Sequence, residues 1–345
     1  MRALIATLAV ITAATVGLLI QQPGFAEACA GLIGSNGNVN LGRTTTLAAY
    51  HDGVEHYVTS FEFQGGGGQF GTLIPLPDAP TNVERGGDWT LQRLQIETSP
   101  PVAERAFFAL GAADEAEVLL EVRIDALDIT VLRGGGPDVA AWATEHGFRL
   151  SPDAPEVLDF YAQRSPIFLA AVFDGDAAAE RGQAIGDGTP VHLTIPTDDP
   201  WVPLRILALG KQPGDLVQAD VFLLTSDEPT LLPAPSDSLA LTHSEPATDL
   251  LLDDLRSDTG MGWMPDSAWL TKLEINSAAG DLGYDLAVDT TGNDSPSIVD
   301  AGLALPTAVP SDNGSLSALW LAAIALAGLA AVFAIAARLT GARVR

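Results

Sequence analysis

Prolines interrupt the apolar segments of this chain and restrict them to short extended pieces. The stretch FGTLIPLPDAP, residues 70–80, carries three prolines. A residue that precedes proline is excluded from the helical region, so Ile74, Leu76 and Ala79 must be extended. Proline also lacks the amide hydrogen that a strand donates, so this segment cannot sit inside a sheet with both edges paired. Together with 23 prolines and 34 glycines in 345 residues, this pattern predicts a strand-rich fold with many turns.

Two kinds of sequence pattern predict the regular elements. The segment from Arg43 to Gly65 is typical of a hairpin turning at Asp52-Gly53, a dipeptide that tolerates the positive φ angles of a type I′ turn. Pro137 and Ser151-Pro152 each open a short helix with one apolar face. We therefore expect an α+β, strand-rich body, built as an antiparallel sheet or a sandwich-like arrangement, with a short helix pair. Further strands are predicted at residues 118–132, 167–173, 191–195, 204–209, 217–224, 270–275 and 284–288.

The charge balance limits the possible partners. Lys and Arg total 17 against 44 Asp and Glu, a formal net charge of −27. Such a field repels nucleic acid and anionic lipid headgroups, which excludes a nucleic-acid role. Divalent cations, basic partners and a saline environment are all compatible with it, because salt screens the self-repulsion of the chain.

The N-terminus has the pattern of a signal peptide over residues 1–28. One arginine precedes an uncharged run at residues 3–20, and small residues at Ala26 and Ala28 suit a signal peptidase. Cleavage there would make Cys29 the first mature residue, which leaves lipid attachment to that cysteine as an alternative. Because Cys29 is the only cysteine, no intrachain disulfide can form and the exported chain depends on its core for stability.

The C-terminus has the pattern of a membrane anchor. Residues 316–337 carry no charge, and a helix of this length spans about 33 Å, close to the roughly 30 Å of a bilayer core. Arg338, Arg343 and Arg345 follow directly, as expected on the cytoplasmic side. Trp320 lies near the other end of the run, where an indole anchors a helix at the membrane interface.

These end segments predict a single-pass protein of the cell membrane. The N-terminal domain lies outside, the C-terminus lies in the cytoplasm, and the lipid bilayer is a partner through the C-terminal helix. We expect an extracytoplasmic domain at 29–288, with a long loop at 226–249. A Gly-, Asp-, Ser- and Pro-rich stalk then covers 289–315, and a cytoplasmic tail covers 338–345.

Several segments together resemble a known bacterial family. They are EACAGL at residues 27–32, the following hairpin, FGTLIPLPDAP, the helical segment at 141–173, and VPLRILAL at 202–209. The chain resembles the family catalogued as domain of unknown function 2330 over roughly residues 29–224. This resemblance implies a secreted or membrane-anchored protein with no assigned activity, and it supplies no catalytic residues.

Few residues form a pattern typical of a chemical site. In a two-residue hairpin, His51 and His56 lie on one sheet face as diagonal neighbours, with Glu55 on the opposite face. Two imidazoles are too few for a closed metal site, which needs three or four ligands. Acidic clusters could supply oxygen ligands to calcium, but none matches the spaced acidic loop of known calcium motifs. These clusters are Asp174, Asp176 and Glu180; Asp198 and Asp199; and Asp253, Asp254 and Asp258.

No nucleophile or catalytic residue can be assigned from the sequence. The adjacent His243, Ser244 and Glu245 do not have the geometry of a triad, and no serine occupies a glycine-flanked elbow. We therefore expect a non-enzymatic surface module that binds a cell-wall or protein partner or contributes to envelope structure, with no cofactor. Two alternatives remain: an extracytoplasmic hydrolase using paired carboxylates, and a calcium-stabilised adhesion domain.

Overall fold

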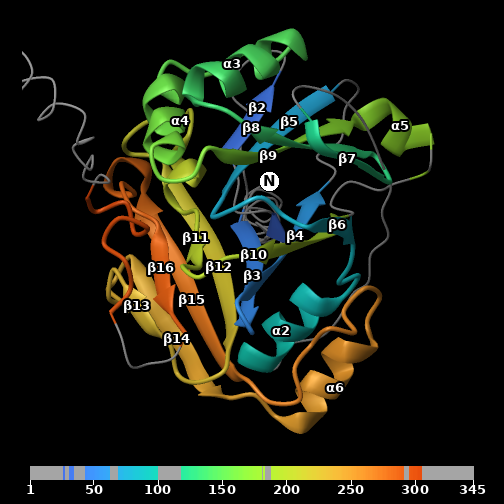
Figure 1. Cartoon of the computed structure of the whole chain (residues 1–345), viewed down its shortest axis with the longest axis vertical. Helices are drawn as coiled ribbons and strands as arrows, with labels where there is room; N and C mark the ends of the chain where they lie inside the picture. The colour runs from blue at the N-terminus through green and yellow to red at the C-terminus, as the bar shows by residue number, and fades with distance from the viewer. Residues whose placement is uncertain are drawn as a thin grey trace, which may run out of the picture. The chain divides into compact units, whose positions relative to one another are not determined.

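The computed structural model describes most of the predicted extracytoplasmic domain (Figure 1). The described residues are 26–27, 31–34, 43–62, 69–99, 118–180, 182, 188–290 and 295–304. The predicted transmembrane helix at 316–337 and tail at 338–345 lie outside them, as does the predicted signal peptide apart from residues 26–27. Within the described ranges, no helix has the length and apolarity needed to cross a membrane.

The largest sheet is mixed. Its described strands follow the order β14-β15-β12-β3-β4-β10-β6, and β1 pairs with β3 as well. The expectation of an antiparallel sheet is correct for the hairpins but wrong for β3 and β12, which run parallel. No tight turn joins these two strands, so local sequence does not fix their relative direction. The strands are β1 (Ala26–Glu27), β3 (Arg43–His51), β4 (Val54–Glu62), β6 (Asn82–Arg85), β10 (Gly188–Pro196), β12 (Leu216–Thr225), β14 (Leu239–Pro246) and β15 (Trp269–Ala278).

The predicted hairpin is the β3–β4 pair. Asp52 and Gly53 both have positive φ angles, 54° and 76°, as the type I′ turn requires. Because side chains alternate along each strand, Ala48 and Tyr57 enter one hydrophobic cluster while Leu47 and Val58 enter another on the opposite face.

A second sheet follows the order β2-β5-β9-β8-β7, and a small third sheet the order β11-β16-β13. The prolyl segment forms β5, which pairs with β2 over Phe70–Leu73 and with β9 over its full length. Pro75 therefore has one unpaired edge, although the first half of β5 lies inside the sheet. The strands are β2 (Gly31–Gly34), β5 (Gln69–Leu76), β7 (Val118–Ile124), β8 (Leu127–Arg133), β9 (Ile167–Asp174), β11 (Trp201–Val202), β13 (Thr230–Leu232) and β16 (Leu286–Asp289).

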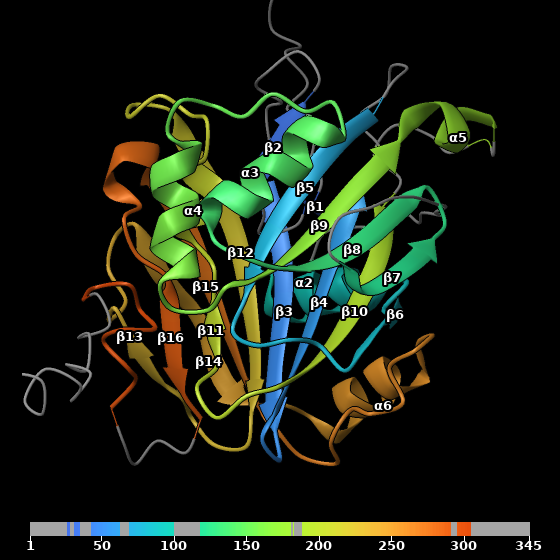
Figure 2. The same cartoon turned by 45° about the horizontal axis from the view of Figure 1, so that its top comes forward.

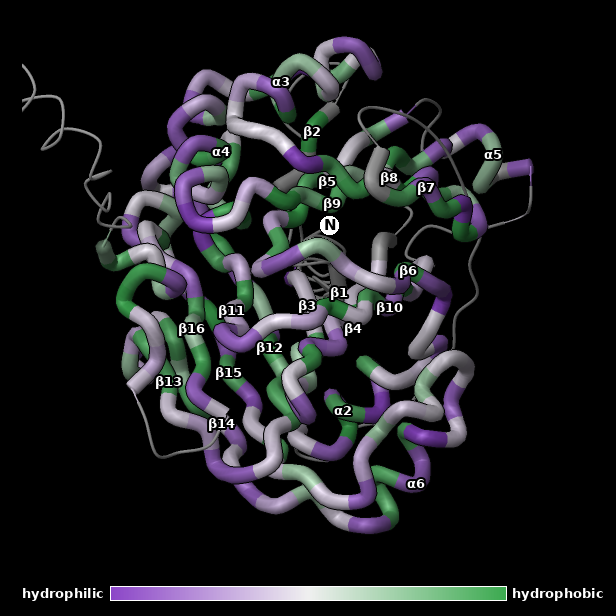
Figure 3. Tube along the Cα trace, viewed as in Figure 1, coloured by the Kyte–Doolittle hydropathy of each residue, from purple (hydrophilic) through white to green (hydrophobic). Residues whose placement is uncertain are grey.

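The two larger sheets pack face to face, and helices cover their outer faces (Figure 2). α3 and α4 pack on the β5–β9 side, whereas α2 and α6 pack on the outer face of β3 and β12. Hydrophilic and hydrophobic positions alternate along α6 (Figure 3), as expected of a helix that buries one face. The helices are α2 (Thr90–Thr98), α3 (Gly136–Glu145), α4 (Ala154–Ala162), α5 (Gly175–Glu180) and α6 (Asp249–Ser257), with the 3-10 turns η1 (Arg205–Ala208) and η2 (Ala279–Asp281).

The predicted helix pair corresponds to α3 and α4. Trp142 and Tyr161 are buried on their inner faces. α3 has proline in its first turn and is followed by Gly147, whose φ of +81° ends the helix.

The strand predicted at 204–209 is wrong, because this segment forms η1. The Asp285 carboxylate accepts hydrogen bonds from the amides of Leu204 and Arg205, at 2.7 and 3.0 Å. These are amides at the start of a turn, which have no partner within it. A side chain about 80 residues later in the sequence thus stabilises the turn over the extended form.

Asp285 also holds α4 and the last described segment. It forms an ion pair with Arg164, and both side chains are fully buried. The Tyr161 hydroxyl donates to Asp285 at 2.8 Å and accepts from the Ile206 amide at 2.8 Å. The Asp285 amide in turn donates to the Ala301 carbonyl at 2.9 Å.

Two low-order segments of the sequence have more structure than expected. The predicted loop at 226–249 contains β13 and β14, and β14 pairs with β15 along its length. Residues 295–304, within the predicted stalk at 289–315, fold back on the body and bury Ala301. Their composition, rich in polar residues and proline, predicted a loop for the first segment and a stalk for the second. The residues that they pair with or pack against lie elsewhere in the chain, so local composition could not indicate these contacts.

We expect Asp285→Asn to lower the free energy of unfolding by about 3–5 kcal/mol, because it leaves the buried Arg164 guanidinium without a counter-charge. Urea denaturation followed by circular dichroism measures this. The control is Asp266→Asn, which removes an exposed carboxylate from its pair with Arg256 and should cost no more than about 1 kcal/mol. Equal losses of unfolding free energy in both variants would contradict the role of Asp285 as the buried counter-charge of Arg164.

Candidate binding site

The tip of the β3–β4 hairpin places polar groups on both sheet faces. Tyr50 and Glu55 point into the space between the sheets, whereas His51 and His56 lie on the outer face beside α6. This is the separation predicted from the two-residue turn. The structure thus divides the groups at the hairpin into an inner carboxyl and an outer pair of imidazoles.

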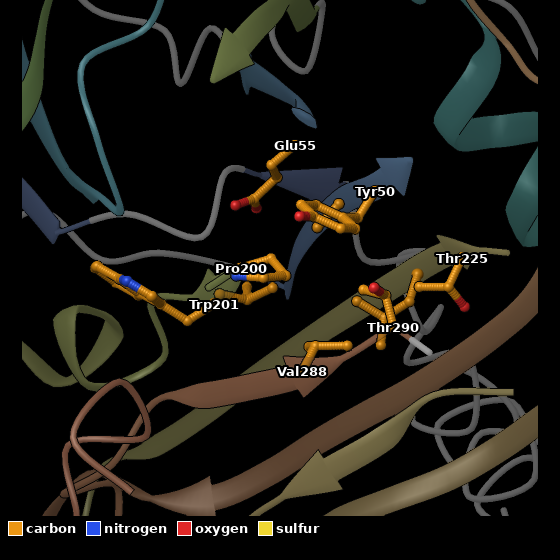
Figure 4. A pocket seen from close by; sticks show the side chains of 10 residues that line it. Tyr50, Glu55, Pro200, Trp201, Thr225, Val288 and Thr290 are labelled. Carbon is orange, nitrogen blue, oxygen red and sulfur yellow. The ribbon is translucent and has the colours of Figure 1, made fainter. Parts of the chain in front are cut away.

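Glu55 lines a small closed space, which we call the Glu55 cavity (Figure 4). Its volume is about 10 Å³, roughly that of one water molecule. Both carboxyl oxygens are buried and have no hydrogen-bond partner among the described residues. Burial raises the pKa of Glu55 to about 8, so the carboxyl is mainly protonated at neutral pH. The other lining residues are Ala48, Tyr50, Pro200, Trp201, Val202, Leu223, Thr225, Val288 and Thr290.

Tyr50 connects this cavity to the loop between β10 and β11. Its hydroxyl donates to the Thr197 carbonyl at 2.9 Å. Burial raises the pKa of Tyr50, and the charges of Asp198, Asp199 and Glu55 raise it further. The loop after Thr197 therefore presents its carboxylates close to the hairpin tip.

An open cleft of about 480 Å³ lies on the other side of this loop, and we call it the aspartate cleft. Four aspartates line it, Asp78, Asp198, Asp199 and Asp300, and among the described residues none of them forms an ion pair. Burial raises the pKa of Asp199, and the neighbouring Asp300 and Asp198 charges add to the effect. The other lining residues are Gly53, Pro77, Arg164, Ser165, Pro196, Thr197 and Trp201.

Arg164 lines the cleft but does not neutralise it. Its guanidinium pairs with Asp285 and lies 4.3 Å from the Phe160 ring centroid and 4.8 Å from that of Trp201. A guanidinium held by a buried carboxylate and flanked by rings has little freedom to turn toward other anions. The same guanidinium donates to the main-chain carbonyl of Asp300, so its hydrogen bonds go to Asp285 and to the backbone and leave the four cleft carboxylates without an ion pair among the described residues.

The predicted histidine pair belongs to a larger group. The rings of His51 and His56 lie 5.1 Å apart between centroids, and a third imidazole, His192 of β10, lies 5.1 Å from His56. Trp263 covers His56 with parallel planes at 3.8 Å. We call these four side chains the histidine cluster. His192 was missed because β10 lies about 140 residues after the hairpin, so only the sheet pairing places it there.

The histidine cluster is arranged for hydrogen bonding within itself. His56 Nδ1 and His192 Nε2 lie 2.9 Å apart and share one hydrogen bond. Within the described part of the chain, no group of three His, Cys, Asp or Glu side chains is placed to hold a metal ion. Burial lowers the pKa of His56 to about 3, with further lowering by His192 and His51.

The other predicted acidic clusters have structural partners. Asp174 accepts the first amides of α5, which contains Asp176 and Glu180. Asp253 and Asp254 pair with Arg256 and Arg93. Asp258 accepts the Trp89 and Thr90 amides at the start of α2, each at 2.9 Å. Asp198 and Asp199 differ from these clusters because they line the aspartate cleft.

The predicted processing and anchoring residues lie largely outside the described part. Ala26 belongs to β1, where it pairs with Arg43 of β3. The remaining predicted processing and anchoring residues are not among the described residues: they are Ala28, Cys29, Trp320, Arg338, Arg343 and Arg345.

The fold and site define a strand-rich α+β protein with mixed sheets and an acidic cleft. Residues 23–228 match the family described as "Uncharacterized protein conserved in bacteria (DUF2330)". The chain belongs to this family, as the sequence motifs indicated. No curated protein matches the chain.

Solved structures of baculovirus P35 are similar at low levels. One is the crystal structure of P35, with 8% identity over 71% of this chain and 96% of that chain, at a TM-score of 0.38. Another is a mutated P35 after caspase cleavage, with 9% identity over 71% and 99% and a TM-score of 0.39. The caspase-8/P35 complex gives 9% identity over 72% and 96%, with a TM-score of 0.36.

We expect Glu55→Gln to stabilise the fold at alkaline pH. Because the folded pKa is raised from 4.5 to about 8, the unfolded chain loses this proton first as pH rises. Wild-type stability should therefore fall by about 1.4 kcal/mol per pH unit between these values. Glutamine removes the titration, so the two proteins should match near pH 4 and diverge toward pH 8. Urea denaturation across this range is the measurement.

The matched control is Glu245→Gln, which changes an exposed glutamate of β14. Its free energy of unfolding should follow that of the wild type at every pH. A Glu55→Gln protein that is no more stable than the wild type at pH 8 contradicts the buried, protonated state of Glu55.

Proposed function

We propose that this chain is a membrane-anchored, extracytoplasmic binding module that captures a positively charged ligand in the aspartate cleft. The observation that carries the proposal is the set of four aspartates around one open cleft, whose carboxylates form no ion pair among the described residues because Arg164, which also lines the cleft, pairs with Asp285. The raised pKa of Asp199, caused by burial and then by Asp300 and Asp198, indicates mutual repulsion that a cationic ligand would relieve.

The charge of the whole chain supports the same ligand class. A net charge of −27 attracts cations over a distance of about one Debye length, and a concave site concentrates that field. Encounter with a basic partner would therefore be fast at low salt and slower at high salt.

The spacing of the carboxylates favours amino or guanidinium groups over a single metal ion. Calcium needs six to eight oxygen ligands around one point, and the described residues offer no such convergence of carboxylates. Ammonium or guanidinium groups spread along a basic peptide or polyamine can each meet a different aspartate. Calcium-stabilised adhesion is therefore the weaker alternative.

A hydrolase using paired carboxylates is the second candidate. Glu55 and Asp199 both have raised pKa values, which is the pattern of an acid–base pair. However, Glu55 lines the water-sized Glu55 cavity and Asp199 lines the aspartate cleft. A substrate in the cleft would not contact the Glu55 carboxyl, so the geometry supports binding better than hydrolysis.

The location outside the cytoplasm rests on the two ends of the sequence. We expect protease added to intact spheroplasts to degrade the acidic domain, while an epitope tag placed after Arg345 stays protected until the membrane is permeabilised. Immunoblotting with antibodies to the domain and to the tag measures both. Protection of the domain in intact spheroplasts would reverse the proposed topology.

We expect the purified full chain to bind a hexalysine peptide with an affinity that falls as salt rises. The double variant Asp198→Asn, Asp199→Asn should weaken binding about three- to tenfold, equivalent to about 0.7–1.4 kcal/mol for two exposed ion pairs. Isothermal titration calorimetry at low and moderate salt provides the dissociation constants, and calcium chloride is titrated in parallel.

The control Asp253→Asn, Asp266→Asn removes the same charge from exposed carboxylates that pair with Arg256, outside the cleft. This variant should bind like the wild type. If it weakens binding as much as the cleft variant does, the attraction comes from net charge alone. If calcium binds and the peptide does not, the proposed ligand class is wrong.

A further inference from the structure

The histidine cluster brings together three of the five histidines in the chain. They come from three neighbouring strands and project from the outer face of the sheet, so the pairing of β3, β4 and β10 fixes their positions. His56 and His192 are nearly fully buried, at 7% and 2% exposure. No histidine of the cluster has a role in the proposed ligand site.

The hydrogen-bond order within the cluster limits how many protons it can hold. His192 Nδ1 lies 3.3 Å from Glu84 Oε1, and His192 Nε2 lies 2.9 Å from His56 Nδ1. His192 Nδ1 does not reach Glu84 with hydrogen-bond geometry, so the order is set at the facing nitrogens: one hydrogen lies between the two neutral rings, and with His56 Nδ1–H as the donor, His192 Nε2 accepts it. One extra proton on His56 leaves this order intact. A second, on His192 Nε2, would bring two N–H groups face to face.

Trp263 covers this hydrogen bond. Its ring lies parallel to His56, at 3.8 Å between centroids, and 5.0 Å from His192. The indole belongs to the segment 259–264, which buried residues hold on both sides of Trp263. Before it, the Asp258 carboxylate accepts hydrogen bonds from the amides at the start of α2, and Met261 and Met264 lie in the core on either side of the indole. The indole is therefore the part of the segment whose position depends on the imidazoles.

We propose that the histidine cluster is an acid-responsive latch. At neutral pH the uncharged rings of His56 and His192 pack under Trp263, and protonation of both in acidic medium breaks the His56–His192 hydrogen bond and releases the indole. The device responds to protons independently of any ligand in the aspartate cleft. Its function would be to loosen the segment 259–264 when the medium outside the cell becomes acidic.

The surroundings set the response at unusually acidic pH. Two carboxylates are within ion-pair distance of the cluster, Glu84 beside His192 and Asp52 at 3.7 Å from His51. Asp258, on the covering segment, has its carboxylate directed at α2. Burial lowers the pKa of His56 and of His192, and Glu84 partly opposes the change in His192.

The test measures Trp263 fluorescence as a function of pH. The emission of the full chain minus that of its Trp263→Phe variant isolates one of the six tryptophans. We expect this difference signal to be constant from pH 8 to about 4 and to shift to longer wavelength as the pH falls toward about 3, the pKa of His56, with loss of amide protection at 259–264. The double variant His56→Gln, His192→Gln should show no shift, and far-UV circular dichroism follows the global fold.

Two further variants keep the proposal falsifiable if the double variant does not fold. Glu84→Gln, at the exposed carboxylate within ion-pair distance of His192, should move the transition to lower pH because it removes the charge that favours protonated His192. His146→Gln changes a histidine stacked on another tryptophan, Trp142, and should leave the transition unchanged. A transition near pH 6.5, one unaffected by Glu84→Gln, or one that coincides with global unfolding overturns the latch.

Discussion

The buried Asp285 carboxylate is the interaction on which the arrangement of the cleft depends. A charge in the interior is tolerated only if its oxygens are fully hydrogen-bonded, and Asp285 achieves this by drawing in Arg164, Tyr161 and the amides of η1. These groups belong to separate elements, so one carboxylate fixes α4 against η1 and β16. It also engages Arg164, the one arginine among the described residues that line the cleft, which leaves the cleft aspartates without an ion pair from that guanidinium.

The β3–β4 hairpin places two opposed titrations on the two faces of one sheet. Glu55 is held protonated on the inner face, so its contribution destabilises the fold as pH rises from 4.5 toward 8. His56 is held neutral on the outer face, so its contribution destabilises the fold as pH falls below 6.5 toward 3. Both costs originate in burial, and together they favour a stability maximum at mildly acidic pH.

Sequence periodicity predicted the elements that depend on local interactions. The Asp52-Gly53 hairpin, the helix pair and most long strands were correct, because turn chemistry and alternation are local properties. η1 required Asp285, and the start of α2 required Asp258, about 170 residues away. α6 did have a signal, since Thr248 caps it by accepting the Leu251 amide at 3.2 Å. The cleft could not be predicted, because Asp78 and Asp300 join Asp199 only through the fold.

The abundance of carboxylates makes most of them uninformative about function. The 44 acidic side chains outnumber the 17 basic ones by more than two to one, so an unpaired aspartate on a convex surface indicates no ligand. Asp258 is satisfied by the amides at the start of α2, and Asp254 pairs with Arg93. Asp199 differs because it lies in a concavity beside Asp198 and Asp300. Arg164 is committed to Asp285 and to the Asp300 carbonyl, so among the described residues no ion pair offsets the repulsion between the cleft aspartates, and this repulsion is the basis of the cationic ligand that we propose.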